Sequence, residues 1–295
     1  MEQQIQGKSW YDRYYKLMLV VPIILILVSL IYLGIFYSKH HDFINKDISL
    51  SGGTTITLTG NIDTDKLQTE LKKEFSDIGF RKLTDITTGK QISFIIESSA
   101  QPEQLEESIA KILGYPLDET NSSIEFTGSS LSSNFYRQLI IAVIISFILM
   151  SIVVAISFRT FVPSMAVILS ALFDIVMPLA LVDAIGLKIS AAGVAAFLML
   201  IGYSVDTDVL LTTRALKKKE GTLNQRIYGA FKTGITMTLT SIAAVVPVFF
   251  IISGLPDSFR QIFLILAFGL CADIVNTWFT NASIIKFYCI KKGIN

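Results

Sequence analysis

The sequence predicts a polytopic α-helical membrane protein that carries one small α+β domain. Three observations lead to this fold class. Hydrophobic residues make up 52% of the 295 residues. Several apolar runs reach the roughly 20 residues that a membrane-spanning helix requires, whereas one long stretch after the first run has the mixed pattern of a soluble domain. A net charge of +1 argues against a nucleic-acid partner.

Six apolar runs have the length and composition of spanning helices. The first run is too long, and too much apolar sequence follows it, for a cleaved signal peptide. Six spans would place both ends of the chain on one side of the bilayer. The expected spans are Leu17–Tyr37, Leu139–Phe158, Val162–Val182, Ile189–Leu211, Ile235–Ile252 and Ile262–Ile285.

Lysine and arginine are distributed unevenly between the two sides of these spans, and this bias predicts the orientation. The two short loops on one side hold only Lys188 and Arg260, whereas the termini and the remaining loops are rich in both residues. We therefore expect both termini in the cytoplasm of a multi-pass cell-membrane protein. The expected segments are cytoplasmic tails at 1–16 and 289–295, transmembrane helix 1 at 17–37, an extracytoplasmic domain at 38–133, and transmembrane helices 2–6 within 134–288 with a cytoplasmic loop at about 212–234.

Residues 38–133 have the pattern of a ferredoxin-like domain with the order β-α-β-β-α-β. Alternating apolar residues indicate strands, and apolar residues three and four apart indicate helices. The expected elements are a strand at Ile48–Thr59 with a bulge at Gly52-Gly53, a helix at Asp63–Ile78, a hairpin of Phe80–Ile86 and Gln91–Glu97 around the turn Thr87–Lys90, a helix that begins at Pro102, and a strand at Ser123–Gly128.

This domain shows no nucleophile–base pair, no metal-binding spacing and no phosphate loop. His40 and His41 lie next to each other just outside the first span, where a solvated pair is a better explanation than a metal site. We expect no catalytic residue, no metal and no cofactor, and interpret the domain as a binding or lever element.

Carboxylates inside the spans are the candidates for chemistry, because ionisable residues in a membrane usually mark an ion path. Asp206 and Asp208 lie in the fourth span and, being two residues apart, face opposite ways around a helix. Asp206 shares its face with Gly202 and Tyr203 and is the first candidate for ion coupling. Arg214 is a further candidate for ion coupling. It lies about 80° around and about 12 Å along the axis from Asp206, so a direct pair in one straight helix is not expected. The alternative is that both aspartates simply end the span among the lipid headgroups.

Three further spans carry polar stripes that could meet. For the mid-span Asp174, an interhelical hydrogen bond and a role in an ion path are both open. The stripe of the fifth span is small and polar, which suits close packing against a neighbouring helix. The stripes comprise Asp174 in the third span, Thr233, Thr236, Thr240 and Ala244 in the fifth, and Asp273, Asn276, Thr277 and Asn281 in the sixth.

The stretch from Gly202 to Asp208, followed by Arg214, resembles the fourth-span motif of the SecF branch of the SecD/SecF protein-export family, in the resistance-nodulation-division superfamily. Asp206 stands where that motif has asparagine, and it matches the aspartate of the paired SecD motif. Asp174 falls where the family has His-Asp, here with Phe173 in place of the histidine. The strand Ile48–Leu58 is similar to the family's Gly-Gly-Thr strand. The departures and a short tail point to an archaeal version.

The resemblance implies an accessory, non-enzymatic subunit that pairs with SecD, associates with the SecY-type channel and the translocating preprotein, and uses the proton or sodium gradient to assist export. Burial favours the neutral form of a carboxyl group and a nearby cation favours its charged form, so a membrane carboxylate whose neighbours rearrange can load and release a proton. The alternatives are a half-size exporter of lipids or drugs, which usually has a larger outer domain, and a non-coupled scaffold of the channel. An intramembrane aspartyl protease would need a Gly-x-Gly-Asp motif, which is absent.

Overall fold

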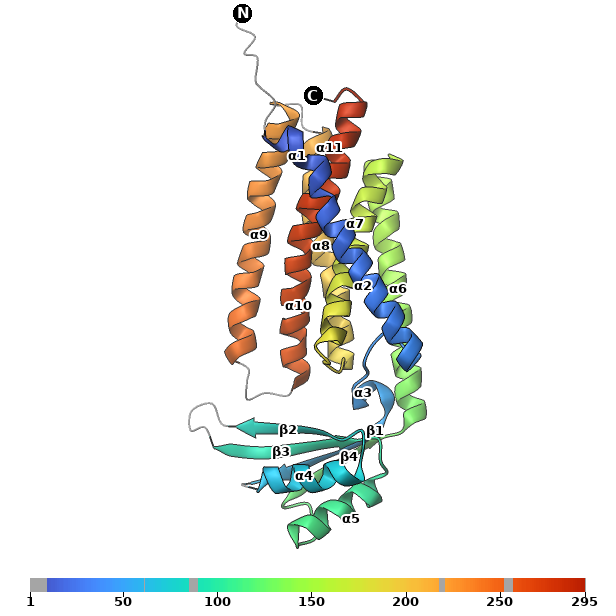
Figure 1. Cartoon of the computed structure of the whole chain (residues 1–295), viewed down its shortest axis with the longest axis vertical. Helices are drawn as coiled ribbons and strands as arrows, with labels where there is room; N and C mark the ends of the chain where they lie inside the picture. Colours follow the sequence, from blue (N-terminus) through green and yellow to red (C-terminus); the bar gives the residue numbers. More distant parts are fainter. Residues whose placement is uncertain (1–9, 61, 85–89, 218–220, 252–256, 295) are drawn as a thin grey trace, which may run out of the picture.

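The computed structural model describes residues 10–60, 62–84, 90–217, 221–251 and 257–294. It consists of a long helical bundle and an α+β domain beyond one end of that bundle (Figure 1). Within the described residues, six helices are long and apolar enough to cross a membrane, which agrees with the predicted fold class. The predicted turn residues Thr87, Thr88 and Gly89 lie outside the described residues.

The spanning helices extend past the apolar runs from which they were predicted. For example, α6 begins at Ser129 rather than Leu139, because no helix-breaking residue separates the polar start from the apolar run. The helices are α1 and α2 (Trp10–Met18 and Val20–His40), α6 (Ser129–Phe158), α7 (Phe161–Ala184), α8 (Ala191–Lys217), α9 (Leu223–Ile251), and the continuous series α10 (Asp257–Val275), η2 (Asn276–Asn281) and α11 (Ala282–Lys291).

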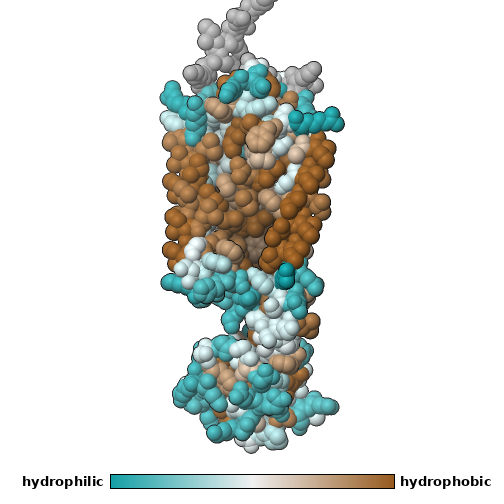
Figure 2. Space-filling model, turned by 90° about the vertical axis from the view of Figure 1, so that its right-hand side faces the viewer, coloured by the Kyte–Doolittle hydropathy of each residue, from teal (hydrophilic) through white to brown (hydrophobic). Residues whose placement is uncertain are grey.

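On the face of the molecule shown in Figure 2, a broad apolar band covers the bundle and ends in hydrophilic side chains above and below. Large apolar side chains face outward along this band; Val153 on α6 and Ile31 on α2 are 63% and 62% exposed. Such a contiguous apolar surface is far larger than a soluble protein tolerates and fits a lipid environment. The bundle therefore sits in the membrane, with the α+β domain beyond one surface.

The α+β domain has four antiparallel strands in the order β2-β3-β1-β4, which confirms the predicted ferredoxin-like arrangement. Fully buried apolar side chains of the sheet and helices, such as Ile56, Phe94, Leu67 and Leu105, form its core. The helices lie on the face away from the bundle, so the other face of the sheet is turned toward the bundle (Figure 1). The elements are β1 (Gly53–Thr59), α4 (Thr64–Glu74), β2 (Gly79–Thr84), β3 (Gln91–Ser98), α5 (Pro102–Leu113) and β4 (Ser122–Thr127).

The predicted first strand is wrong in its first half. Residues Ile48–Ser51 form a short helix, α3, and β1 begins only at Gly53. A Cβ at Gly52, whose φ is +84°, would lie 2.6 Å from Ser129 Cα, and one at Gly53 would lie 2.4 Å from the Ser98 carbonyl oxygen. The two glycines therefore permit close backbone contacts rather than a bulge.

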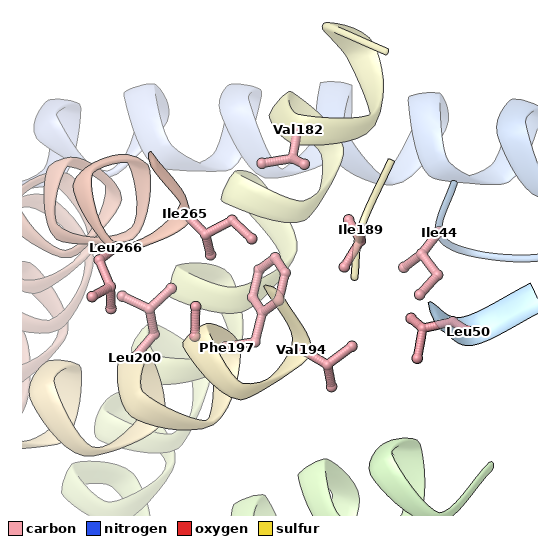
Figure 3. Packing of buried hydrophobic residues seen from close by; sticks show 10 residues of the cluster. Ile44, Leu50, Val182, Ile189, Val194, Phe197, Leu200, Ile265 and Leu266 are labelled. Carbon is pink, nitrogen blue, oxygen red and sulfur yellow. The ribbon is translucent and has the colours of Figure 1, made fainter. Parts of the chain in front are cut away.

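A buried apolar cluster joins the domain to the bundle (Figure 3). Leu50 of α3 lies in this cluster, which explains why an apolar alternation typical of a strand belongs to a helix instead. The chain after α2 also runs beside the loop between α7 and α8, where Asp47 N donates to Ile189 O at 3.0 Å and Ile189 N donates to Asn45 O at 2.6 Å. The cluster comprises Ile44, Leu50, Val182, Ile189, Val194, Ala196, Phe197, Leu200, Ile265 and Leu266.

Asp42 forms a second anchor between the domain linker and the bundle. Its carboxylate pairs with Lys46 at 2.7 Å and accepts a hydrogen bond from the Tyr136 hydroxyl of α6 at 2.8 Å. Partial burial works against the charged form, but these hydrogen bonds outweigh it and hold the pKa of Asp42 below its usual range.

Candidate functional site

Three aspartates from three spanning helices converge inside the bundle. Asp174 of α7, Asp208 of α8 and Asp273 of α10 are 1%, 0% and 2% exposed. Hydroxyl and amide side chains surround them, and we call the set the buried polar cluster. It comprises Asp174, Ser204, Thr207, Asp208, Thr238, Asp273, Asn276, Thr277 and Asn281, all of them buried.

Asp174 is held by two neighbouring helical segments. The Ser204 hydroxyl of α8 donates to its Oδ2, and Asn276 Nδ2 of η2 donates to its Oδ1 at 2.6 Å. A carboxylate that joins α7, α8 and η2 in this way makes their packing depend on its protonation state.

Asp273 is bonded by three threonines from different segments. Thr207 of α8 lies 2.9 Å from its Oδ1, Thr277 of η2 lies 3.0 Å from the same oxygen, and Thr238 of α9 lies 3.2 Å from its Oδ2. Asp273 therefore lies where α8, α9 and α10 meet.

Thr277 connects two of the carboxyl groups. Its hydroxyl oxygen lies 3.0 Å from Oδ1 of both Asp208 and Asp273, yet a hydroxyl group has one proton to donate. Asn281 Nδ2 also donates to Asp208 Oδ1 at 2.8 Å, whereas Asp208 Oδ2 is buried with no hydrogen-bond partner in the described part of the chain. The single proton of the Thr277 hydroxyl can therefore serve only one of the two carboxylates at a time.

The cluster also lacks a counter-charge. Among the described residues, no lysine or arginine forms an ion pair with any of the three aspartates. Arg214 donates instead to the Gly229 carbonyl of α9 at 2.5 Å, and Lys286 pairs with Asp12 of α1 at 2.7 Å. Burying several uncompensated carboxylates costs several kcal/mol per ion. The cluster can therefore hold protons on its carboxyl groups or take up a cation, and changes its hydrogen bonds when it does so.

Local helix geometry brings these side chains together. On α8, residues 204, 207, 208 and 211 recur at the spacing of a single helix face, and all four are buried. In the sixth span, Asn276–Asn281 form a π-helical segment, a rare element that occurs mostly as single turns at functional sites. From this segment Asn276 donates to Asp174, Thr277 bonds to Asp273, and Asn281 donates to Asp208.

The structure separates the two fourth-span aspartates. They do face opposite ways, but it is Asp208 that points into the bundle, whereas Asp206 is exposed together with Gly202 and Tyr203. Neither ends the helix, because α8 continues to Lys217. Asp206 shares no bond with the buried polar cluster, and Arg214, another expected member, is directed at the backbone of α9.

The expected packing stripe of the fifth span is not buried within this chain. Thr236 and Thr240 are exposed, and their hydroxyls bond to carbonyls of their own helix at 2.8 and 2.7 Å. The face of α9 that packs inward carries Thr238 and Gly234, and a Cβ at Gly234 would lie 2.5 Å from the Trp278 ring. All three of the spans with expected stripes contribute to one site, but the fifth span does so through Thr238 rather than through the expected stripe.

The prediction from sequence did not include three members of the cluster, Ser204, Thr207 and Thr238. A signal was present for two of them, because Ser204 and Thr207 lie four and one residues before Asp208 and so share its face. Thr238 had no distinguishing signal among the several threonines of its helix.

Comparison with known proteins places the chain in a family. Residues 108–291 match the family model described as protein export membrane protein SecD/SecF, C-terminal. The protein-export membrane protein SecF of Methanolacinia petrolearia is 38% identical over 97% of this chain and 99% of its own length. That of Methanocaldococcus jannaschii is 37% identical over 93% of this chain and 95% of its own length.

The fold has a solved counterpart. The structure titled SecDF, a translocon-associated membrane protein, from Thermus thermophilus superposes with a TM-score of 0.71 over 98% of this chain and 40% of that chain, at 17% identity. The family model, the two relatives and the six-span architecture agree. The chain therefore belongs to the SecD/SecF family of protein-export membrane proteins.

Proposed function

We propose that the chain is an accessory subunit of the Sec protein translocase that pairs with a SecD subunit and uses the transmembrane proton or sodium gradient to assist preprotein export. Its relatives are named as protein-export membrane proteins, which supports the export role. The observation that carries the gradient coupling is the buried polar cluster, with three carboxyl groups from α7, α8 and α10 and no cation paired to them among the described residues.

The cluster can act on the helices because each carboxyl group bonds to more than one of them. When Asp208 or Asp273 gains a proton, Thr277 can accept a hydrogen bond from one carboxyl group while it donates to the other. When the proton leaves, two carboxylates compete for one hydroxyl proton, and this competition pushes η2 and α8 toward another arrangement. In one arrangement the carboxyl groups would be accessible from one side of the membrane, and in the other arrangement from the opposite side. Ion movement through these two arrangements would then be coupled to export.

Contacts between the bundle and the α+β domain would transmit such a change to the domain. Its linker is hydrogen bonded to the loop that leads into α8, and the core at the junction contains Leu50 of the domain side together with Leu200 of α8 and Ile265 of α10. Movements of α8 or α10 would therefore reposition the domain that we expect to meet the preprotein outside the cell.

The orientation follows from charge. Both Lys188 and Arg260 lie near the end of the bundle that faces the α+β domain, while α1 and the end of α11 lie at the opposite end (Figure 1). The positive-inside rule then places that opposite end in the cytoplasm.

The partner would cover the exposed polar face of α8. Asp206 is exposed in mid-helix, Tyr203 is 50% exposed, and a Cβ at Gly202 would meet nothing within 4 Å. A carboxylate facing lipid is costly, and small residues suit close helix approach. A SecD helix packed here would remove Asp206 from lipid and supply the other half of the two-fold arrangement usual in such transporters.

Sealed vesicles that contain the channel and SecD, with or without this chain, test the proposal. An imposed gradient should stimulate export only when the chain is present, and an ionophore that collapses the gradient should abolish the stimulation. Equal stimulation by the chain with and without a gradient would favour a non-coupled scaffold. Extrusion of a lipid or drug with no effect on export would favour a half-size exporter.

A further inference from the structure

A cavity of about 330 Å³ lies between the α+β domain and the near end of the bundle. Strand β2 lines it from the domain side through Arg81, and the bundle lines it with Lys188 of the α7–α8 loop, Phe249 of α9, and Arg260 and Leu264 of α10. Its volume is within the range of small-molecule sites. It is separate from the buried polar cluster, with which it shares no residue.

Two basic residues from this side of the membrane line the cavity. In the sequence stretches 185–190 and 252–260, Lys188 and Arg260 are the basic residues, and both line the same cavity. Lysine and arginine are generally sparse in loops on the non-cytoplasmic side. Membrane topology does not explain why Lys188 and Arg260 lie at one cavity on this side. Their convergence therefore indicates a binding site for an anionic ligand.

The acidic residues of the lining do not neutralise these two cations. Glu97 pairs with Arg81, and the Asp47 carboxylate accepts the Ile48 backbone N–H at 2.7 Å. Within the described residues, neither Lys188 nor Arg260 forms an ion pair, and Arg260 lies 4.7 Å from the centre of the Phe249 ring. The lining thus holds three basic residues against the two carboxylates of Asp47 and Glu97, and its net charge is positive.

The site is built rather than fortuitous, because a buried glutamine fixes its two cationic segments to each other. Gln261 is 6% exposed; its Nε2 donates to the Lys188 carbonyl, and its Oε1 accepts from Ser190 N at 2.9 Å and Ser190 Oγ at 2.8 Å. These bonds hold the backbone of Lys188 beside the first turn of α10, from which Arg260 projects.

The position favours a lipid headgroup as the source of the anion. The cavity lies where spanning helices α7 and α10 end and begin, which is the level of the headgroups. Leu264, one helical turn below Arg260, and Phe249 continue the lining into the apolar zone. Phosphate matches the donors of arginine and lysine, and basic pockets beside transmembrane helices bind lipid headgroups.

We propose that this cavity binds a phosphate-bearing anion, namely the headgroup of an anionic lipid from the leaflet on the side of the α+β domain. A headgroup held by Lys188 and Arg260 of the bundle, and adjacent to Arg81 of β2, would link the position of the domain to the local lipid.

The test uses the purified, delipidated full chain in non-ionic detergent and isothermal titration with short-chain phosphatidylglycerol, short-chain phosphatidylcholine and inorganic phosphate. The double variant Lys188→Gln/Arg260→Gln removes the two charges. Arg260→Lys keeps the charge, and Lys111→Gln removes an exposed charge from α5, outside the cavity. Thermal unfolding of each variant reports whether it is folded.

Phosphatidylglycerol should bind saturably and more tightly than phosphatidylcholine. Because hydrogen bonds to charged groups are strong, each lost cation should weaken binding by about tenfold or more, so the double variant should lose most of its affinity, while Arg260→Lys and Lys111→Gln should keep theirs. Unchanged phosphatidylglycerol binding in a folded double variant would overturn the proposal, and so would loss of binding in Lys111→Gln. If the double variant does not fold, Arg260→Gln alone decides between the same two results. Equally tight binding of inorganic phosphate, lost in the same variants, would keep the site and identify a free anion as its source.

Discussion

Replacement of Gly269 of α10 by alanine should destabilise the chain. A Cβ at this position would lie 2.2 and 2.3 Å from the two Cδ atoms of Leu200 and 2.8 Å from its Cγ. Leu200 is 2% exposed within the buried apolar cluster that joins the domain to the bundle, so its side chain is enclosed and must shift to admit a methyl group. Overpacking of this kind costs about 1–3 kcal/mol, while alanine gains up to about 1 kcal/mol over glycine in a helix. Gly269→Ala should therefore destabilise the chain by about 0–2 kcal/mol net, and by about 1–3 kcal/mol relative to a glycine-to-alanine change that meets no neighbour.

Gly202 of α8 provides the matched control, since a Cβ there would meet nothing within 4 Å. Gly202→Ala should be neutral or stabilising by up to about 1 kcal/mol. Unfolding by sodium dodecyl sulfate in mixed micelles, followed by circular dichroism, measures the stability of both variants. Leu200→Ala should cost about 2–5 kcal/mol alone, and the double variant Gly269→Ala/Leu200→Ala should be more stable than the sum predicts. Equal stability of Gly269→Ala and Gly202→Ala, or simple additivity in the double variant, would refute the packing argument.

Three further predictions follow from the fold. In a cysteine-free background, a membrane-impermeant thiol reagent should label a cysteine at Ser99 from outside intact cells and should not label one at Lys292; the opposite pattern would invert the topology. The α+β domain, expressed as residues 42–130, should unfold cooperatively by circular dichroism, and Leu67→Ala, at a fully buried position, should cost about 2–5 kcal/mol; a disordered spectrum would show that the domain requires the bundle. Because the folded pKa of Asp42 is lowered, its contribution is complete above its unfolded pKa of about 4 and is lost as pH falls through the folded value. Asp42→Asn should thus lower the free energy of unfolding at pH 7 and reduce its further loss at acid pH, as measured by denaturant titration. An unchanged dependence of that free energy on acid pH would contradict this.

The architecture was predictable because its signals are local. Apolar runs of sufficient length and a mixed segment between the first two were enough for the spans and for the β-α-β-β-α-β order. Helix ends were less predictable, since α6 begins ten residues before the apolar run at a serine that carries no strong signal. The helix at Ile48–Ser51 was missed because Leu50 is buried against the bundle, a tertiary contact that alternation alone cannot reveal.

The candidate site was predictable in composition but not in arrangement. Asp174, Asp273, Asn276 and Thr277 were recognised because polar residues in apolar runs are conspicuous. The choice between Asp206 and Asp208 depends on which face of α8 turns inward, and α8 is apolar on all sides near its start, so its sequence period is weak. The π-helical turn at Asn276–Asn281 adds a rotation that ideal helix geometry does not include.

The central claim is that the buried polar cluster, and not the exposed face of α8, couples the gradient to export. Asp208→Asn and Asp206→Asn are matched substitutions, two residues apart on one helix, that keep shape and remove titration. The decisive measurement is gradient-stimulated export in sealed vesicles, with co-purification of SecD as the check that each variant assembles. We predict that Asp208→Asn assembles but loses the stimulation, while Asp206→Asn retains most of it. Full stimulation in Asp208→Asn, or its loss in Asp206→Asn alone, would contradict the claim.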